Sequence, residues 1–122
     1  MFIAALHFIA TDRELYWTLR WFDAPMHFLG GVVMALLAGW VGMRVIGVPF
    51  LLAGKTRHFF LIIAATLVAG VMWEFFELFI GIGQEPGYAL DTLHDLLFDL
   101  AGGLLGYLLI RFFLLKMNTG TV

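Results

Sequence analysis

The sequence predicts an all-α, polytopic membrane protein with three transmembrane helices and an N-terminal interfacial helix. The first observation behind this prediction is composition: 62% of the 122 residues are hydrophobic and only 13% are charged, whereas about a quarter of the residues in a soluble domain are charged. The second is the presence of three long stretches with few charges. Because a compact soluble fold could not bury so much apolar surface, we expect a lipid bilayer around residues 1–122, which form a single membrane domain.

The three spans are expected at about 22–46, 57–82 and 90–115. Each stretch reaches the length of roughly 20 mostly apolar residues that a helix needs to cross the hydrocarbon core. Glycine and proline residues, which favour turns, stand between the stretches. These features predict three antiparallel membrane helices that are joined by short loops.

Residues 1–21 are expected to form the interfacial segment. Thr11 and Glu14 have the spacing of a capping box, which predicts that a helix begins at Thr11. Three aromatic residues follow, and such residues are enriched at membrane interfaces. They are Tyr16, Trp17 and Trp21. We expect this helix to lead into the first span, with a bend near Pro25.

The distribution of lysine and arginine predicts the orientation in a cell membrane. Five of the seven basic residues flank the loop between the first two spans or follow the third span. They are Arg44, Lys55, Arg57, Arg111 and Lys116. Because cytoplasmic loops carry an excess of basic residues, this loop and the C-terminus are expected in the cytoplasm. The acidic residues lie toward the opposite, outward-facing end.

The residue types that are missing exclude several functions. The chain has no cysteine and no serine, so disulfides, thiolate metal sites and serine- or cysteine-based catalysis are excluded. The net charge is −2 and no basic stripe is present, so a nucleic-acid partner is not expected. Chemistry at this protein must therefore use carboxylates, imidazoles, the backbone, or a bound ion or water.

Six carboxylates and two imidazoles lie in or beside the outer halves of the spans. They are Asp23, His27, Glu74, Glu77, Asp91, His94, Asp95 and Asp99. The pair in the first span is four residues apart, and the pair in the second span is three apart, so each pair shares a helix face. The four in the third span fall within an arc of roughly 140°. Gly102 and Gly106 continue that face inward and predict close helix packing beneath the polar residues.

Some of these residues could have ordinary structural roles. Asp23 could be the N-cap of the first span, and Asp91 or Thr92 could cap the third. His27 could form an interhelical hydrogen bond. Glu74 and Asp99 lie too deep to be caps, and a charge at the membrane centre costs roughly 3 kcal/mol. These two positions therefore indicate a functional site.

Three motifs resemble those of the YjdF-like membrane proteins and, more distantly, the VanZ-like group associated with glycopeptide-antibiotic resistance. The motifs are Asp23-Ala24-Pro25-Met26-His27, Trp73-Glu74-Phe75-Phe76-Glu77, and Asp91-Thr92-Leu93-His94-Asp95 followed by Asp99. The resemblance covers about residues 23–107. It implies a cell-envelope membrane protein in which all of the candidate residues except His94 are shared positions. YjdF-like chains are typically longer, so it also implies a homo-oligomer or a partner membrane subunit.

The favoured hypothesis is that the eight residues bind a divalent metal ion. Carboxylate oxygens and imidazoles suit Mg, Mn, Fe or Zn, and the ligand types alone do not choose among them. Such an ion could activate water for hydrolysis of a lipid-linked or phosphate-bearing envelope substrate, with Glu74 or Glu77 as the general base. Two alternatives stay open at this point: a proton or cation transport element, and a structural or accessory membrane subunit.

Overall fold

Three long helices dominate the computed structural model, which describes residues 6, 9–19, 21–47, 54–81 and 87–118. The part of the chain that is described contains helices and turns but no strand. The main elements are α3 (Asp23–Val41), the π-helix η1 (Gly42–Ile46), α5 (Gly54–Phe79) and α6 (Tyr88–Asn118). These elements confirm the all-α prediction and place all three expected spans within a few residues of their predicted bounds.

Each of the three helices is long and apolar enough to cross a membrane. The candidate spans are Asp23–Val45, Gly54–Phe79 and Tyr88–Leu114, and only 22–28% of the apolar window in each is buried inside the protein. Large apolar side chains such as Trp40, Phe75 and Phe112 are exposed. Because so little of each span is covered by protein, lipid must surround the exposed sides of the three helices.

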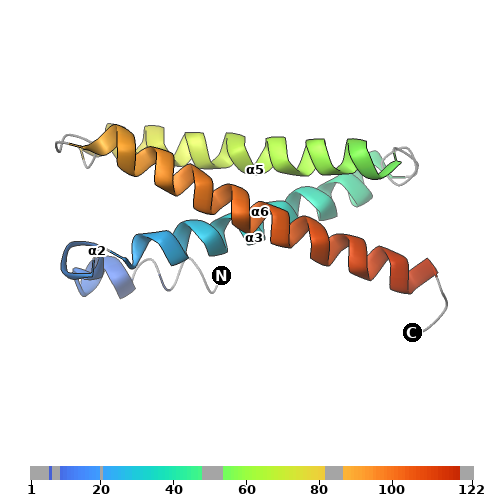
Figure 1. Cartoon of the computed structure of the whole chain (residues 1–122), viewed down its shortest axis with the longest axis horizontal. Helices are drawn as coiled ribbons and strands as arrows, with labels where there is room; N and C mark the ends of the chain where they lie inside the picture. The colour runs from blue at the N-terminus through green and yellow to red at the C-terminus, as the bar shows by residue number, and fades with distance from the viewer. Residues whose placement is uncertain (1–5, 7–8, 20, 48–53, 82–86, 119–122) are drawn as a thin grey trace.

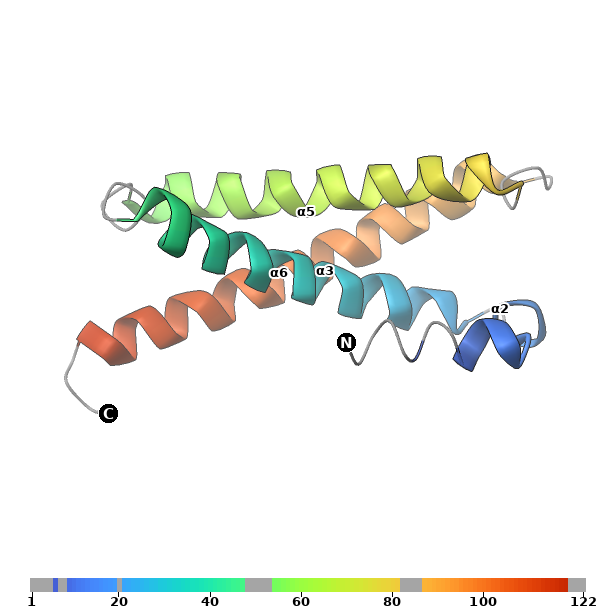
Figure 2. The same cartoon turned by 180° about the vertical axis from the view of Figure 1, so that it is seen from behind.

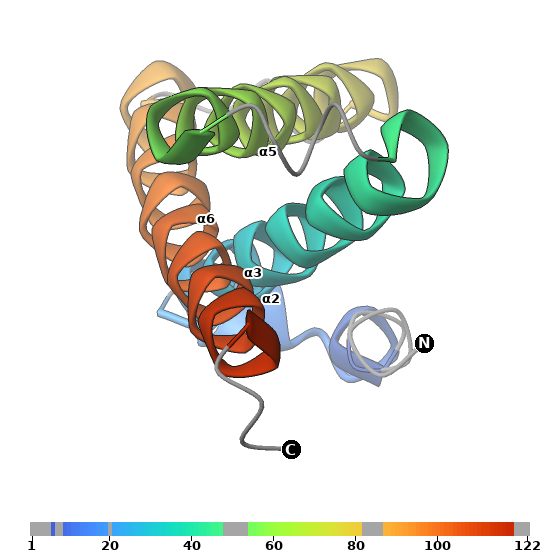
Figure 3. The ribbon, with the colours of Figure 1, turned by 90° about the vertical axis from the view of Figure 1, so that its right-hand side faces the viewer.

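Helices α3 and α6 cross each other, while α5 runs alongside both (Figures 1 and 2). Seen end-on, the three helices form a bundle with a triangular outline (Figure 3). The three helices share a small apolar core of Ala35, Ile62 and Ile110, which lies toward the end of α6. The first turns of α3 and α6 and the last turns of α5 lie at the same end of the molecule (Figure 1). This arrangement gathers the predicted polar residues.

Small residues let α3 and α6 approach closely at their crossing. A Cβ atom at Gly102 of α6 would collide with the backbone carbonyl of Phe28 on α3, and one at Gly106 would lie 2.6 Å from the Cβ of Ala35. Such contacts are possible only where a residue lacks a side chain. The predicted glycine face of the third span is therefore confirmed as the contact with the first span.

The prediction for the N-terminal segment was wrong about where the helix begins. Thr11 lies inside a helical segment that already includes Ile9 and Ala10, and a separate helix, α2 (Leu15–Thr18), begins only after Glu14. Glu14 has a left-handed backbone conformation, with φ of 53°, which ends the preceding turn. The chain turns at Trp21 and Phe22, just before α3, which agrees with the expected bend near Pro25. Because α3 begins at Asp23, this proline occupies the first turn, where it removes no helical hydrogen bond.

The structure does not support the alternative that Asp23 and Thr92 are helix caps. The N-cap of α3 is Phe22, and Asp23 is already inside the helix. Helix α6 begins at Tyr88, directly after Gly87, whose φ is 102°. Thr92 is therefore more than one turn inside α6. As a result, the side chains of Asp23 and Thr92 are available for contacts between helices.

Candidate functional site

His27 lies at the centre of the polar cluster. Its side chain is 6% exposed and projects from the second turn of α3 toward α6. The imidazole Nδ1 lies 3.3 Å from Asp99 Oδ2, within hydrogen-bonding distance. On the other side of the ring, Nε2 lies 3.7 Å from Asp23 Oδ1 and 3.9 Å from Asp95 Oδ1. One histidine thus faces three carboxylates from two helices.

Helical spacing explains this geometry. Asp23 and His27 are four residues apart on α3, and Asp95 and Asp99 are four residues apart on α6, so each pair lies on one face over one turn. The glycine contacts at the crossing bring these two faces together. Asp95 and Asp99 are each 5% exposed. The close approach of the helices therefore buries carboxylates that would be exposed on a single helix.

Three of these residues could hold a metal ion. One ligand atom each from Asp23, His27 and Asp95 lies within 4.8 Å of the others. Two atoms bound to one ion through bonds of about 2.1 Å can be at most about 4.2 Å apart. The distances of 3.7 and 3.9 Å from His27 Nε2 already satisfy this limit. Only a small movement of the two carboxylates would complete a three-ligand site.

Glu74 forms a second buried feature beside this group. It is 5% exposed, and its Oε2 accepts hydrogen bonds from the Tyr88 hydroxyl at 3.1 Å and the Thr92 hydroxyl at 2.6 Å. Its other oxygen, Oε1, is buried and has no hydrogen-bond partner among the described residues. The carboxylate is close enough to Asp23 and Asp95 for their charges to repel. A buried acceptor without a partner is costly, so Oε1 is suited to an additional donor or ion.

The remaining predicted residues lie at the edge of the cluster. Glu77 is half-buried, and its Oε1 accepts a hydrogen bond of 2.9 Å from Trp73 Nε1. Asp91 and His94 are exposed. They line an open pocket of about 340 Å³ together with Asp23, Ala24, Asp95 and Phe98. Two members of the potential metal group, Asp23 and Asp95, thus also face this pocket, which would give a ligand access to them.

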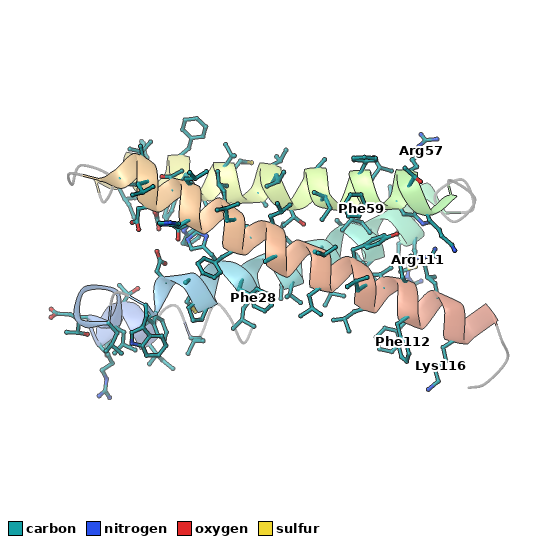
Figure 4. The ribbon with its side chains drawn as sticks, in the orientation of Figure 1. Phe28, Arg57, Phe59, Arg111, Phe112 and Lys116 are labelled. Atoms are coloured by element: carbon teal, nitrogen blue, oxygen red, sulfur yellow. The ribbon has the colours of Figure 1, made fainter. Side chains whose placement is uncertain are left out.

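The charges of the described helices are strongly segregated. The acidic cluster occupies the end where α3 and α6 begin, whereas Arg57, Arg111 and Lys116 lie toward the opposite end (Figure 4). The ion pairs found within the described part of the cluster all involve His27. A single imidazole cannot neutralise several buried carboxylates, so the cluster requires protons or a bound cation.

Sequence reasoning missed several residues that support the site. Tyr88 and Thr92 both donate hydrogen bonds to Glu74, although the sequence suggests only a capping role for Thr92. Their spacing of four residues on α6, beside Asp91 and Asp95, was the available signal. Gly31 and Gly70 were also missed, and a side chain at either position would collide with Asp99. Nothing in the sequence distinguishes these two glycines from others in the spans.

The fold and the cluster define an integral membrane protein with three candidate spans and a buried aspartate–histidine group near one end. The chain belongs to the family described as "Predicted membrane protein (DUF2238)", whose match extends over residues 1–116. This match does not show the more distant relation to the VanZ-like group, which stays an expectation. No curated protein matches the chain, and no solved structure does.

Proposed function

We propose that this protein binds a divalent metal ion through Asp23, His27 and Asp95. The observation that carries the proposal is the convergence of three potential ligand atoms within 4.8 Å of one another. Two further features support it. The cluster has an excess of buried acids over bases, and it opens to a pocket through Asp23 and Asp95. A divalent ion would offset the charge repulsion, and the pocket would leave one side of the ion accessible.

Two carboxylates and one imidazole would suit several divalent ions. Hard oxygen ligands favour Mg or Mn, while the imidazole also suits Fe and Zn. Three protein ligands with an open side are typical of catalytic rather than structural metal sites. This ligand set therefore supports a reactive or exchangeable ion instead of an ion that only stabilises the helices.

We further propose a hydrolytic role for the site, with Glu74 as the general base. A metal ion at Asp23, His27 and Asp95 would lower the pKa of a bound water. Glu74 Oε1 is buried beside these ligands without a partner, while Tyr88 and Thr92 fix its other oxygen. Glu77 is less suitable as the base, because its Oε1 already accepts a hydrogen bond from Trp73 Nε1. The proposed substrate is a lipid-linked or phosphate-bearing molecule of the cell envelope.

The packing below the cluster does not favour a transport pathway through a single chain. A side chain at Gly102 would collide with the Phe28 carbonyl, and a side chain at Gly103 would contact Thr66 at 3.0 Å. The helices are therefore in direct contact on the inward side of Asp99. Among the described residues toward the basic end, no acidic residue continues the row of carboxylates. This arrangement favours a site that is reached from one end only.

Titration of metal-free protein with Zn²⁺ or Mn²⁺ tests the metal site. We expect Asp95→Asn to lose most of the affinity, because it replaces a charged ligand with a neutral amide. Glu74→Gln is the matched control: it also neutralises one buried carboxylate but lies outside the three-ligand group, so it should still bind the ion. Isothermal titration calorimetry in detergent would measure the metal affinity of both variants and of the wild type. Equal affinity of wild type and Asp95→Asn would contradict the proposed ligands.

We propose that the cluster faces outward and that the C-terminus is cytoplasmic, as the basic residues indicate. An alkaline-phosphatase reporter is active only outside the cytoplasm. We therefore expect a fusion after Val122 to be inactive and an insertion near Gly87, between α5 and α6, to be active. The opposite pattern would show that the orientation is inverted.

A further inference from the structure

We infer that Asp99 is a positioning residue for the metal site and not one of its ligands. In this arrangement Asp99 fixes the proton on His27 Nδ1 and the orientation of the ring, so that Nε2 faces the ion. The inference rests on the proposed metal function and deepens it, because it assigns a different role to one of the three carboxylates around His27. Two independent features support it: the side of the ring that Asp99 occupies, and the glycines that enclose its carboxylate.

The two nitrogens of His27 face different partners. Nδ1 is within hydrogen-bonding distance of Asp99, at 3.3 Å, whereas Nε2 faces Asp23 and Asp95 at 3.7 and 3.9 Å. A neutral imidazole has one donor and one acceptor nitrogen, and an ionised carboxylate can only accept. The contact with Asp99 therefore selects Nδ1 as the donor. The lone pair of Nε2 is then directed toward the other two carboxylates, where an ion would bind.

The same geometry separates Asp99 from the ligands. Lone pairs on the two imidazole nitrogens point away from each other, so an ion on Nε2 lies on the far side of the ring from Asp99. Among the described residues, only Asp23 and Asp95 have potential ligand atoms close to Nε2 and to each other. In known metal sites, a ligating histidine almost always donates its other N–H group to a carboxylate, a carbonyl or water, and these partners tune the affinity. Asp99 has the position of such a partner.

Glycines on two helices enclose the Asp99 carboxylate. A Cβ atom at Gly70 of α5 would collide with Asp99 Oδ2, the same oxygen that contacts His27. A Cβ atom at Gly31 of α3 would collide with the Asp99 backbone carbonyl, and one at Gly30 would lie 3.9 Å from Oδ1. The missing side chain of Gly70 therefore leaves room for the carboxylate, while the missing side chain of Gly31 leaves room for the Asp99 backbone. A methyl group at Gly70 would displace Oδ2 from His27 without touching the ligand group.

Two variants test the positioning role of Asp99, one by moving its carboxylate and the other by removing its charge. Gly70→Ala should displace the Asp99 carboxylate, and Asp99→Asn should keep its shape while removing its charge. We expect each to weaken Zn²⁺ binding by about 10–100-fold, the usual effect of removing such a partner. Gly103→Ala is the matched control, because it crowds the same pair of helices one turn deeper against Thr66. This control should bind Zn²⁺ with wild-type affinity.

Nitrogen NMR of protein with ¹⁵N-labelled histidine gives a readout that a general loss of stability would not produce. In the wild type we expect Nδ1 to carry the proton and Nε2 to bind Zn²⁺, with a mixture of tautomers in metal-free Asp99→Asn. If Gly70→Ala does not fold, Asp99→Asn alone still decides the question. Wild-type affinity in Asp99→Asn, or Zn²⁺ on Nδ1 in the wild type, would overturn the inference. A wild-type protein that binds no divalent ion would instead overturn the metal function itself.

Discussion

Removing divalent metal with a chelator should lower the melting temperature of the purified protein, and adding the metal back should restore it. The expected effect is large, because an ion that binds only the folded state stabilises it by about 2.7 kcal/mol at a concentration 100 times its Kd. In the metal-free protein, Asp23, Asp95 and Glu74 would repel one another in a poorly solvated bundle. Thermal unfolding in detergent, followed by circular dichroism, would measure the shift.

The control for this experiment is His27→Ala, which removes the central ligand. Its melting temperature should not respond to the chelator or to added metal, since the three-ligand group is broken. If protons hold the cluster together instead, chelation has no effect on the wild type. Asp95→Asn should then be tolerated or even stabilising, because it removes repulsion. Full stability without metal, combined with a stabilised Asp95→Asn, would indicate a protonated structural cluster.

Gly102→Leu should cause a severe loss of folded protein. A Cβ atom at this position would collide with the backbone carbonyl of Phe28, and a helix backbone cannot move aside as a flexible side chain can. Overpacking of a core typically costs about 1–3 kcal/mol, and we expect the upper end of this range or more. Because the same crossing brings Asp95 and Asp99 to His27, any Gly102→Leu protein that folds should also bind metal poorly.

The matched control is Ala101→Leu, which adds a large apolar side chain at the adjacent, exposed position of α6. It faces lipid, so it should leave the yield and the melting temperature unchanged. Size-exclusion chromatography and thermal unfolding in detergent would compare the two variants. Normal yield and melting of Gly102→Leu would show that α3 and α6 do not pack closely at this point.

Much of the fold was predictable because it depends on local properties of the chain. Long apolar stretches specify the three spans, and the helical period places Asp95, Asp99, Gly102 and Gly106 along one side of α6. The presence of glycines on that side predicted close packing, which the contacts of Gly102 and Gly106 confirm. The N-terminal segment was harder to predict. The left-handed backbone of Glu14 interrupts the helix, and α2 begins as a new helix after it.

The detailed geometry of the site depends on tertiary packing and could not be predicted in the same way. Helical spacing brought eight polar residues to one end, but only three of them lie within reach of a common ion. Sequence cannot show which nitrogen of His27 faces Asp99, because this depends on how α3 is rotated against α6. Nor could it show that Thr92 binds Glu74 instead of capping a helix, since this requires α6 to begin at Tyr88.

The basic residues at one end of the bundle make its two ends electrically different, even when protons or a cation neutralise the acidic cluster. With the acidic cluster at one end and Arg57, Arg111 and Lys116 toward the other (Figure 4), the membrane potential acts on the molecule as a whole. Moving one elementary charge across 100 mV changes the energy by about 2.3 kcal/mol. A negative cytoplasm would therefore stabilise the proposed orientation after insertion. A cation that reaches His27 from outside would cross the part of that voltage between the outer face and the cluster, so a more negative cytoplasm should favour its binding.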